Sequence, residues 1–259
     1  FRNVTGVQTC ALPISSFDEI STIINGALKL GIDPDHGYDF IKHFEERYKH
    51  RSRDPISTGW DILDKYIQGG HGKKELGVVV APTGAGKSML LVHLGAAAMK
   101  AGKNVVYYTL ELSDTVIGKR FDSCLTSIPL KSLDYLKEEV YEKVSKVSGK
   151  LIIKEYPTKS VSTETIRNHL IKLRQKDFIP DMIIVDYADL LKPVSSQKEK
   201  RNELESIYEE LRGIASELDC PVWTASQTNR SGINAEIVTM ESIREAYRDR
   251  KSTRLNSSH

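Results

Sequence analysis

The stretch LGVVVAPTGAGKS at residues 76–88 decides the fold. Residues 76–80 have the length and the β-branched composition of a buried strand, and residues 89–99 continue with a helical pattern. Between them, residues 81–88 match a P-loop in which alanine replaces the first glycine. A strand, a glycine-rich loop and a helix in this order predict a phosphate site, and an ordinary glycine-rich turn is the alternative.

The residue types in this loop suit a nucleotide. Small residues let backbone N–H groups turn toward phosphate oxygens, and Gly86 keeps the backbone close to them. Lys87 supplies positive charge to the β- and γ-phosphates, and Ser88 ligates Mg²⁺. ATP and Mg²⁺ are therefore the expected cofactors. The expected binding residues are Ala81, Pro82, Thr83, Gly84, Ala85, Gly86, Lys87, Ser88 and Met89.

Four further short apolar runs follow, at residues 105–110, 151–154, 182–185 and 222–225. They alternate with segments of helical length, and residues 200–218 form the clearest amphipathic helix. Continuous apolar strands separated by helices predict an α/β fold with a mainly parallel sheet that helices cover on both faces.

Three polar residues follow these apolar runs, Glu111 and Asp186 directly and Gln227 after Ser226. Asp186 is expected to hold Mg²⁺ through a water molecule, Glu111 to orient and deprotonate the attacking water, and Gln227 to sense the γ-phosphate. Each has an alternative: an acid that merely ends a strand at 186, a helix N-cap at 111 and a plain surface glutamine at 227.

Composition limits the possible function classes. The 259 residues are 39% hydrophobic and 28% charged, with no apolar run approaching 18 residues, which predicts a soluble globular protein without a membrane span. A net charge of +2 leaves nucleic-acid contact to a local basic surface. The cysteines lack CxxC spacing, so no zinc cluster is expected, and Cys124 and Cys220 are predicted to be reduced core thiols.

The two ends carry the pattern of translated sequencing adapter. Codons for residues 249–259 can be chosen whose opposite strand translates as residues 4–14. We therefore expect residues 1–14 and 249–259 to be artefact and residues 15–248 to be an internal fragment of a longer gene. Two ordinary disordered tails are the alternative.

These segments together resemble the motor domain of the DnaB-like, superfamily 4 replicative helicases, in the version that tailed bacteriophages carry. The resemblance rests on STGWDILD at 57–64, the P-loop, LEL at 110–112, DYADL at 186–190 and SQTNR at 226–230. It implies a RecA-like fold, a homo-hexameric ring, and ATP-driven translocation on single-stranded DNA with unwinding at a replication fork. It also implies a primase and a helicase loader as partners, no membrane association, and the bacterial host cytoplasm if the protein is phage-encoded.

The resemblance also assigns roles and domains. It implies Lys87, Glu111 and Gln227 as catalytic residues, with Ser88 and Asp186 as the metal residues. Residues 15–54, with short helices expected over 17–30 and 38–50, resemble a linker that packs on the neighbouring subunit, and a plain N-terminal extension is the alternative. Residues 55–248 resemble a RecA-like ATPase core that is truncated at its C-terminal end.

This truncation affects the expected activity. The arginine finger of the family lies beyond the strand that carries the glutamine, and such an arginine is worth about 10³ to 10⁵ in rate. The fragment is therefore expected to bind ATP·Mg²⁺ but to hydrolyse it weakly.

A basic segment at residues 192–201 lies between the strand that ends at Asp186 and the long helix. Its four basic residues without an aromatic platform suit sequence-independent phosphate contact, and a solvated charged loop is the equal alternative. The candidate DNA-binding residues are Lys192, Lys198, Lys200, Arg201 and, after the glutamine strand, Arg230.

Two other functions stay open. One is another RecA-like ATPase, such as a strand-exchange recombinase or a KaiC-type regulator. The other is a non-catalytic nucleotide-binding scaffold or helicase partner. Unwinding of a forked duplex separates the helicase from the first, and DNA-stimulated ATP hydrolysis separates it from the second.

Overall fold

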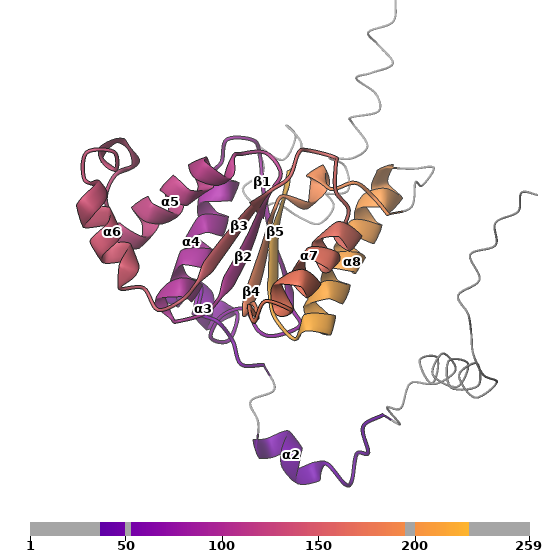
Figure 1. Cartoon of the computed structure of the whole chain (residues 1–259). Coiled ribbons are helices and arrows are strands. Elements are labelled where there is room, and N and C mark those ends of the chain that lie inside the picture. The colour runs from indigo at the N-terminus through magenta and orange to yellow at the C-terminus, as the bar shows by residue number, and fades with distance from the viewer. Residues whose placement is uncertain (1–36, 50–52, 195–199, 228–259) are drawn as a thin grey trace, which may run out of the picture. The chain divides into compact units, whose positions relative to one another are not determined.

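The computed structural model describes residues 37–49, 53–194 and 200–227 (Figure 1). Contacts divide the chain into two units, residues 1–51 and residues 52–259. The expected adapter segments and the helix expected over 17–30 lie outside the described residues.

The first unit contains helix α2 (Phe44–Lys49). A helix is expected over residues 38–50, but the structure has a turn before residue 44. The Asp39 carboxylate causes the difference, because it accepts hydrogen bonds from the backbone N–H groups of Ile41 and Lys42 at 3.1 and 2.9 Å. Such a side-chain contact competes with helical hydrogen bonds, so the helix begins later.

The second unit is built on one five-stranded sheet with the order β1-β5-β4-β2-β3, in which all pairings are parallel. The strands are β1 (Leu76–Ala81), β2 (Val105–Thr109), β3 (Leu151–Glu155), β4 (Met182–Asp186) and β5 (Val222–Gln227). Each strand predicted from an apolar run is present, with ends that differ by at most two residues. The α/β prediction is confirmed.

Helices cover both faces of this sheet (Figure 1). The longer helices of this unit are α4 (Lys87–Lys100), α5 (Asp114–Thr126), α6 (Lys137–Ser145), α7 (Thr163–Arg174) and α8 (Lys200–Leu218), and the short ones are α3 (Asp61–Tyr66), η1 (Leu130–Ser132) and η2 (Ala188–Leu190). The amphipathic helix predicted over residues 200–218 is confirmed as α8.

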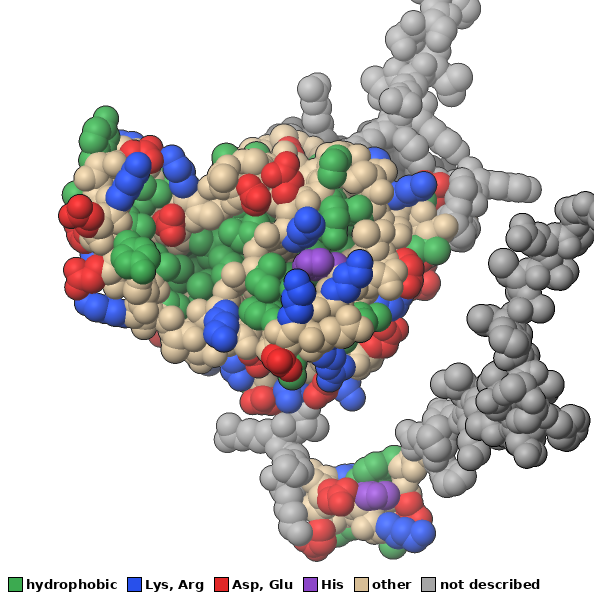
Figure 2. Space-filling view, viewed as in Figure 1, with side chains coloured by type: hydrophobic (Ala, Val, Ile, Leu, Met, Phe, Trp, Pro, Cys, Tyr) green, Lys and Arg blue, Asp and Glu red, His purple; other side chains and the backbone are tan. Residues whose placement is uncertain are grey.

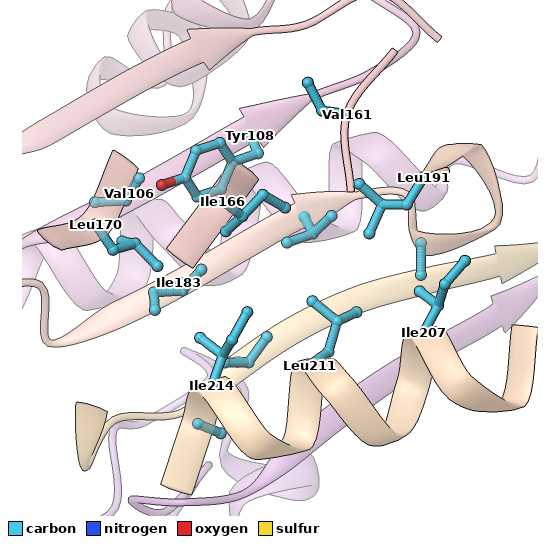
Figure 3. Close-up of a cluster of buried hydrophobic side chains, with 14 of the residues drawn as sticks. Val106, Tyr108, Val161, Ile166, Leu170, Ile183, Leu191, Ile207, Leu211 and Ile214 are labelled. Atoms are coloured by element: carbon cyan, nitrogen blue, oxygen red, sulfur yellow. The ribbon is translucent and has the colours of Figure 1, made fainter. Parts of the chain in front are cut away.

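Successive strand residues point to opposite faces, so each strand contributes to two cores. Val106 and Ile183 pack with α7 and α8 in the cluster that Figure 3 shows. Their neighbours Val105 and Ile184 pack with α4 and α5 on the other face. Burial on both faces explains why these strands are continuously apolar in the sequence.

Two further observations concern composition. Cys124 and Cys220 are free thiols, and Cys220 is buried as expected while Cys124 is half-buried. None of the described helices combines the length and the apolar composition that a bilayer crossing requires.

Gly77 on β1 gives a first testable prediction. A Cβ atom on Gly77 would lie 2.3 Å from the Trp223 ring, so the indole must shift to admit it. We expect Gly77→Ala to lower the free energy of unfolding by about 1–3 kcal/mol, as overpacking does. Urea denaturation measures this change. Gly118→Ala on α5 is the control, because its Cβ would lie 3.9 Å from the nearest atom and should stabilise the helix; equal stability of Gly77→Ala and the parent chain would contradict the packing.

Candidate functional site

Because all five strands are parallel, their carboxyl ends meet at one edge of the sheet. We call this the carboxyl edge. It gathers Ala81, Thr109, Glu155, Asp186 and Gln227, which are the last residues of the five strands. Ligands of open parallel sheets bind at such an edge.

The P-loop joins β1 to α4 at the carboxyl edge. Gly84 and Gly86 have φ values of +78° and +92°, in the left-handed region. A Cβ atom on either residue would meet no atom within 4 Å, so backbone conformation, and not crowding, requires glycine here. Helix α4 starts at Lys87, two residues before the expected start, which places the positive end of its dipole at the loop.

Lys87 lies over its own loop. Its Nζ donates hydrogen bonds to the backbone carbonyls of Ala81 and Pro82 at 3.1 and 3.0 Å. The same Nζ lies 5.8 Å from the centre of the Tyr187 ring, directly after β4. The ammonium group is therefore near both the P-loop backbone and the end of the strand that carries Asp186.

Asp186 is 1% exposed at the end of β4. Its Oδ2 accepts a hydrogen bond from the Tyr107 hydroxyl at 2.7 Å. Its Oδ1 is buried and has no hydrogen-bond partner among the described residues. Burial raises the pKa of Asp186, while the hydroxyl groups of Tyr107 and Ser88 oppose that rise.

These residues fit a magnesium ion. A buried carboxylate oxygen that has no donor in the described part of the chain, together with a serine hydroxyl, offers the hard oxygen ligands that Mg²⁺ prefers. A nearby cation would also favour the ionised carboxylate, which burial disfavours.

Glu111 follows β2 and is exposed. The backbone N–H of Leu110 donates to the Asp186 carbonyl at 2.9 Å, which holds this segment beside the end of β4. The negative charge of Glu111 contributes to the raised pKa of Asp186. Helix α5 is capped by Ser113, whose Oγ accepts from the Val116 N–H at 3.3 Å, so the N-cap alternative for Glu111 is wrong.

Gln227 lies beside Ala81, since the two residues are register partners on β5 and β1. Its Nε2 donates a hydrogen bond to the Thr83 hydroxyl in the P-loop. The Tyr187 hydroxyl donates to its Oε1 at 3.4 Å. The side chain thus contacts the P-loop, unlike that of a plain surface glutamine.

The candidate DNA-binding residues are only partly described. Lys192 is exposed after η2, Lys198 and Arg230 lie outside the described residues, and Lys200 and Arg201 begin α8 with side chains that are not described. On the face in Figure 2, basic and acidic side chains are interspersed. Among these candidates only the side chain of Lys192 is described, so the prediction of a common DNA-binding surface stays a prediction.

Three residues near the site escape prediction from the sequence. Tyr107 reads as an ordinary core residue within an apolar run, although its hydroxyl meets Asp186. Arg120 on α5 carries a charge that lowers the pKa of both Asp186 and Tyr107. Asp189 belongs to the DYADL segment, which is the one signal that draws attention to it.

Tyr107→Phe tests the contact to Asp186. The change removes a donor from a buried carboxylate, so we expect a loss of about 1–3 kcal/mol in the free energy of unfolding at pH 7. The Tyr107 hydroxyl favours the ionised form of Asp186, whose folded pKa is raised by burial, so the loss should shrink as the pH falls through that pKa and the carboxyl group becomes protonated. Urea denaturation at pH 7 and at acidic pH measures it. Tyr141→Phe, at a 77% exposed position, is the control, and an equally small effect for both variants would refute the contact.

The comparisons with known proteins agree with this fold. The family model of the DnaB-like helicase C-terminal domain matches residues 55–237. The DnaB-like replicative helicase of Enterobacteria phage T4 is 31% identical over 242 residues, covering 88% of this chain and 51% of that protein. The replicative DNA helicase DnaB of Helicobacter pylori is 30% identical over 181 residues, covering 68% and 37%. The chain thus spans about half the length of the first relative and less of the second.

Two solved structures share the fold at 18% identity each. An ATPase domain superposes with a TM-score of 0.67 over 83% of this chain and 79% of its own. A DnaB-like replicative helicase, described with its interactions with primase, superposes with a TM-score of 0.64 over 90% and 59%. Since the family model matches well over half of the residues, the chain belongs to the DnaB-like helicase C-terminal domain family.

Proposed function

We propose that this chain is the ATP-driven motor of a replicative DNA helicase of the tailed-bacteriophage type. It acts as a homo-hexameric ring that moves along single-stranded DNA and unwinds duplex at the replication fork. The observation that carries the proposal is the meeting of the P-loop, Asp186 and Gln227 at the carboxyl edge in a chain of this family. Family membership implies nucleotide binding, and the finer assignments below are ours.

In this proposal residues 81–89 hold the nucleotide. The Lys87 ammonium contacts two backbone carbonyls, and a phosphate oxygen is a stronger, charged acceptor than either. Lys87 therefore turns to the β- and γ-phosphates when ATP binds. Backbone N–H groups of the loop and the N-terminus of α4 bind the remaining phosphate oxygens.

Ser88 and Asp186 would hold Mg²⁺, the serine directly and the aspartate through a water molecule. Oδ1 of Asp186, which has no hydrogen-bond partner among the described residues, would be available to that water, while the Tyr107 hydroxyl keeps its hydrogen bond to Oδ2. The ion, when bound, neutralises charge on the β- and γ-phosphates.

Glu111 accepts the proton of the attacking water, and Gln227 contacts the γ-phosphate. Glu111 is suited to its part because it is exposed beside the end of β4 and is free of the capping role. Gln227 already reaches a P-loop hydroxyl, so its amide lies beside the loop that holds the phosphates in this proposal. Lys192, Lys198, Lys200, Arg201 and Arg230 contact DNA phosphates, and a primase and a helicase loader are the partners.

Forked-duplex unwinding by the complete gene product, with ATP and Mg²⁺, tests the proposal. We expect unwinding and ATP hydrolysis that single-stranded DNA stimulates, both lost in Lys87→Ala. ATP-driven pairing of homologous strands without unwinding would favour a recombinase instead. Absence of any Lys87-dependent ATP hydrolysis would favour a non-catalytic nucleotide-binding protein.

A further inference from the structure

Asp189 is a buried acid next to the site that the proposed mechanism does not use. It lies in η2 and is 8% exposed. Its carboxylate accepts hydrogen bonds from the Tyr208 hydroxyl at 2.8 Å, the Ser226 hydroxyl at 3.3 Å and the backbone N–H of Gln227 at 3.2 Å. A carboxylate is costly to bury unless donors surround it, so these contacts define its place.

The donors come from two separate elements. Ser226 and Gln227 end β5, whereas Tyr208 lies on α8. Hydrogen bonds therefore connect the P-loop to α8 in series, from Thr83 through Gln227 and Asp189 to Tyr208. We call these four residues the relay.

The backbone that carries Asp189 is itself held in place. Lys159 Nζ donates to the Asp189 and Leu191 carbonyls at 2.6 and 2.8 Å. On α8, Ile207, directly before Tyr208, and Leu211, one turn after it, are buried in the core cluster of Figure 3. The backbones of Asp189 and Tyr208 are thus both held in place by other contacts. The hydrogen bond between these two residues can therefore fix the position of Gln227.

We propose that Asp189 and Tyr208 are positioning residues for Gln227. They fix the position of this γ-phosphate sensor relative to α8. The proposal deepens the proposed function, since it rests on contact between Gln227 and the γ-phosphate. Neither residue contacts the P-loop directly in the described hydrogen bonds, so both act through the Gln227 backbone. Their loss should therefore affect discrimination between ATP and ADP more than nucleotide binding as such.

The experiment measures the ratio of ATP to ADP affinity, with Mg²⁺, by titration of this chain and its variants. Gln227→Ala should lower the ratio by about tenfold, the worth of one hydrogen bond to a charged group. Asp189→Asn and Tyr208→Phe should each lower it by about three- to tenfold, with ADP affinity nearly unchanged. Ser206→Ala is the matched control, because it removes a different α8 hydrogen bond, to Glu210 at 3.0 Å, and should keep the ratio.

A double-mutant cycle completes the test. If Asp189 acts through Gln227, the ratio for Gln227→Ala combined with Asp189→Asn should match that of Gln227→Ala alone. Additive losses, or unchanged ratios in Asp189→Asn and Tyr208→Phe, would overturn the relay. Tyr208→Phe keeps the ring and hence the packing, so its result stands even if Asp189→Asn fails to fold. Failure of the proposed function is seen separately, as ATP binding by the parent chain that Lys87→Ala leaves intact.

Discussion

Lys87→Ala is expected to weaken ATP·Mg²⁺ binding by about 10- to 150-fold, the range for a hydrogen bond to a charged group. The ammonium lies over the P-loop, where its two acceptors are neutral carbonyls that a phosphate can replace. Titration with a fluorescent ATP analogue at fixed ionic strength measures the loss. The variant should fold normally, because those two hydrogen bonds are partly solvent-exposed.

Lys172→Ala on α7 is the matched control for this variant. Lys172 is exposed, and its replacement by alanine removes the same charge as Lys87→Ala does. A general electrostatic effect would therefore appear equally in both variants. We expect Lys172→Ala to bind ATP·Mg²⁺ as the parent does. Equal affinities in the parent and in Lys87→Ala would contradict the assignment of residues 81–88 as the phosphate site.

Asp186→Asn is expected to have two effects of opposite sign. In the presence of nucleotide, the affinity for Mg²⁺ should fall by about 10- to 100-fold, because the carboxylate that holds the ion's water becomes a neutral amide. In the absence of nucleotide, the free energy of unfolding at pH 7 should rise. The folded pKa of Asp186 lies above its unfolded value, so the ionised carboxylate costs stability at that pH and the amide removes the cost.

The gain in stability should disappear as the pH falls below the ordinary carboxyl pKa, where Asp186 is protonated in both states. Mg²⁺ titrations in the presence of nucleotide and urea denaturation at several pH values measure the two effects. If the variant is less stable than the parent at pH 7 and binds Mg²⁺ with unchanged affinity, the assignment of Asp186 to the metal site is wrong.

The fold was largely predictable because burial on both faces leaves an unambiguous pattern. Residues 105–108 and 182–185 are apolar throughout, since each side chain meets a helix on one side of the sheet or the other. The start of α2 was not predictable in the same way. The Asp39 side chain decides it through a local hydrogen bond that helical periodicity does not reveal.

The candidate site likewise contains some residues that the sequence predicts and others that it does not. Asp186, Glu111 and Gln227 could be selected because each follows an apolar run, and parallel strands bring such ends to one edge. Tyr107 could not be selected in this way, because its contact with Asp186 requires β2 and β4 to be neighbours in the sheet. The pattern of apolar residues does not reveal the order of the strands. Asp189 likewise needs α8 to pack beside β5 before Tyr208 can reach it.

The central claim is that Lys87, Ser88, Asp186 and Gln227 surround one metal-bound triphosphate. Electron paramagnetic resonance of Mn²⁺, titrated into the chain with a non-hydrolysable ATP analogue, tests it most directly, because Mn²⁺ replaces Mg²⁺ among oxygen ligands. We predict one Mn²⁺ site that forms only with the nucleotide and weakens in both Ser88→Ala and Asp186→Asn. Unchanged Mn²⁺ binding in both variants would contradict the account.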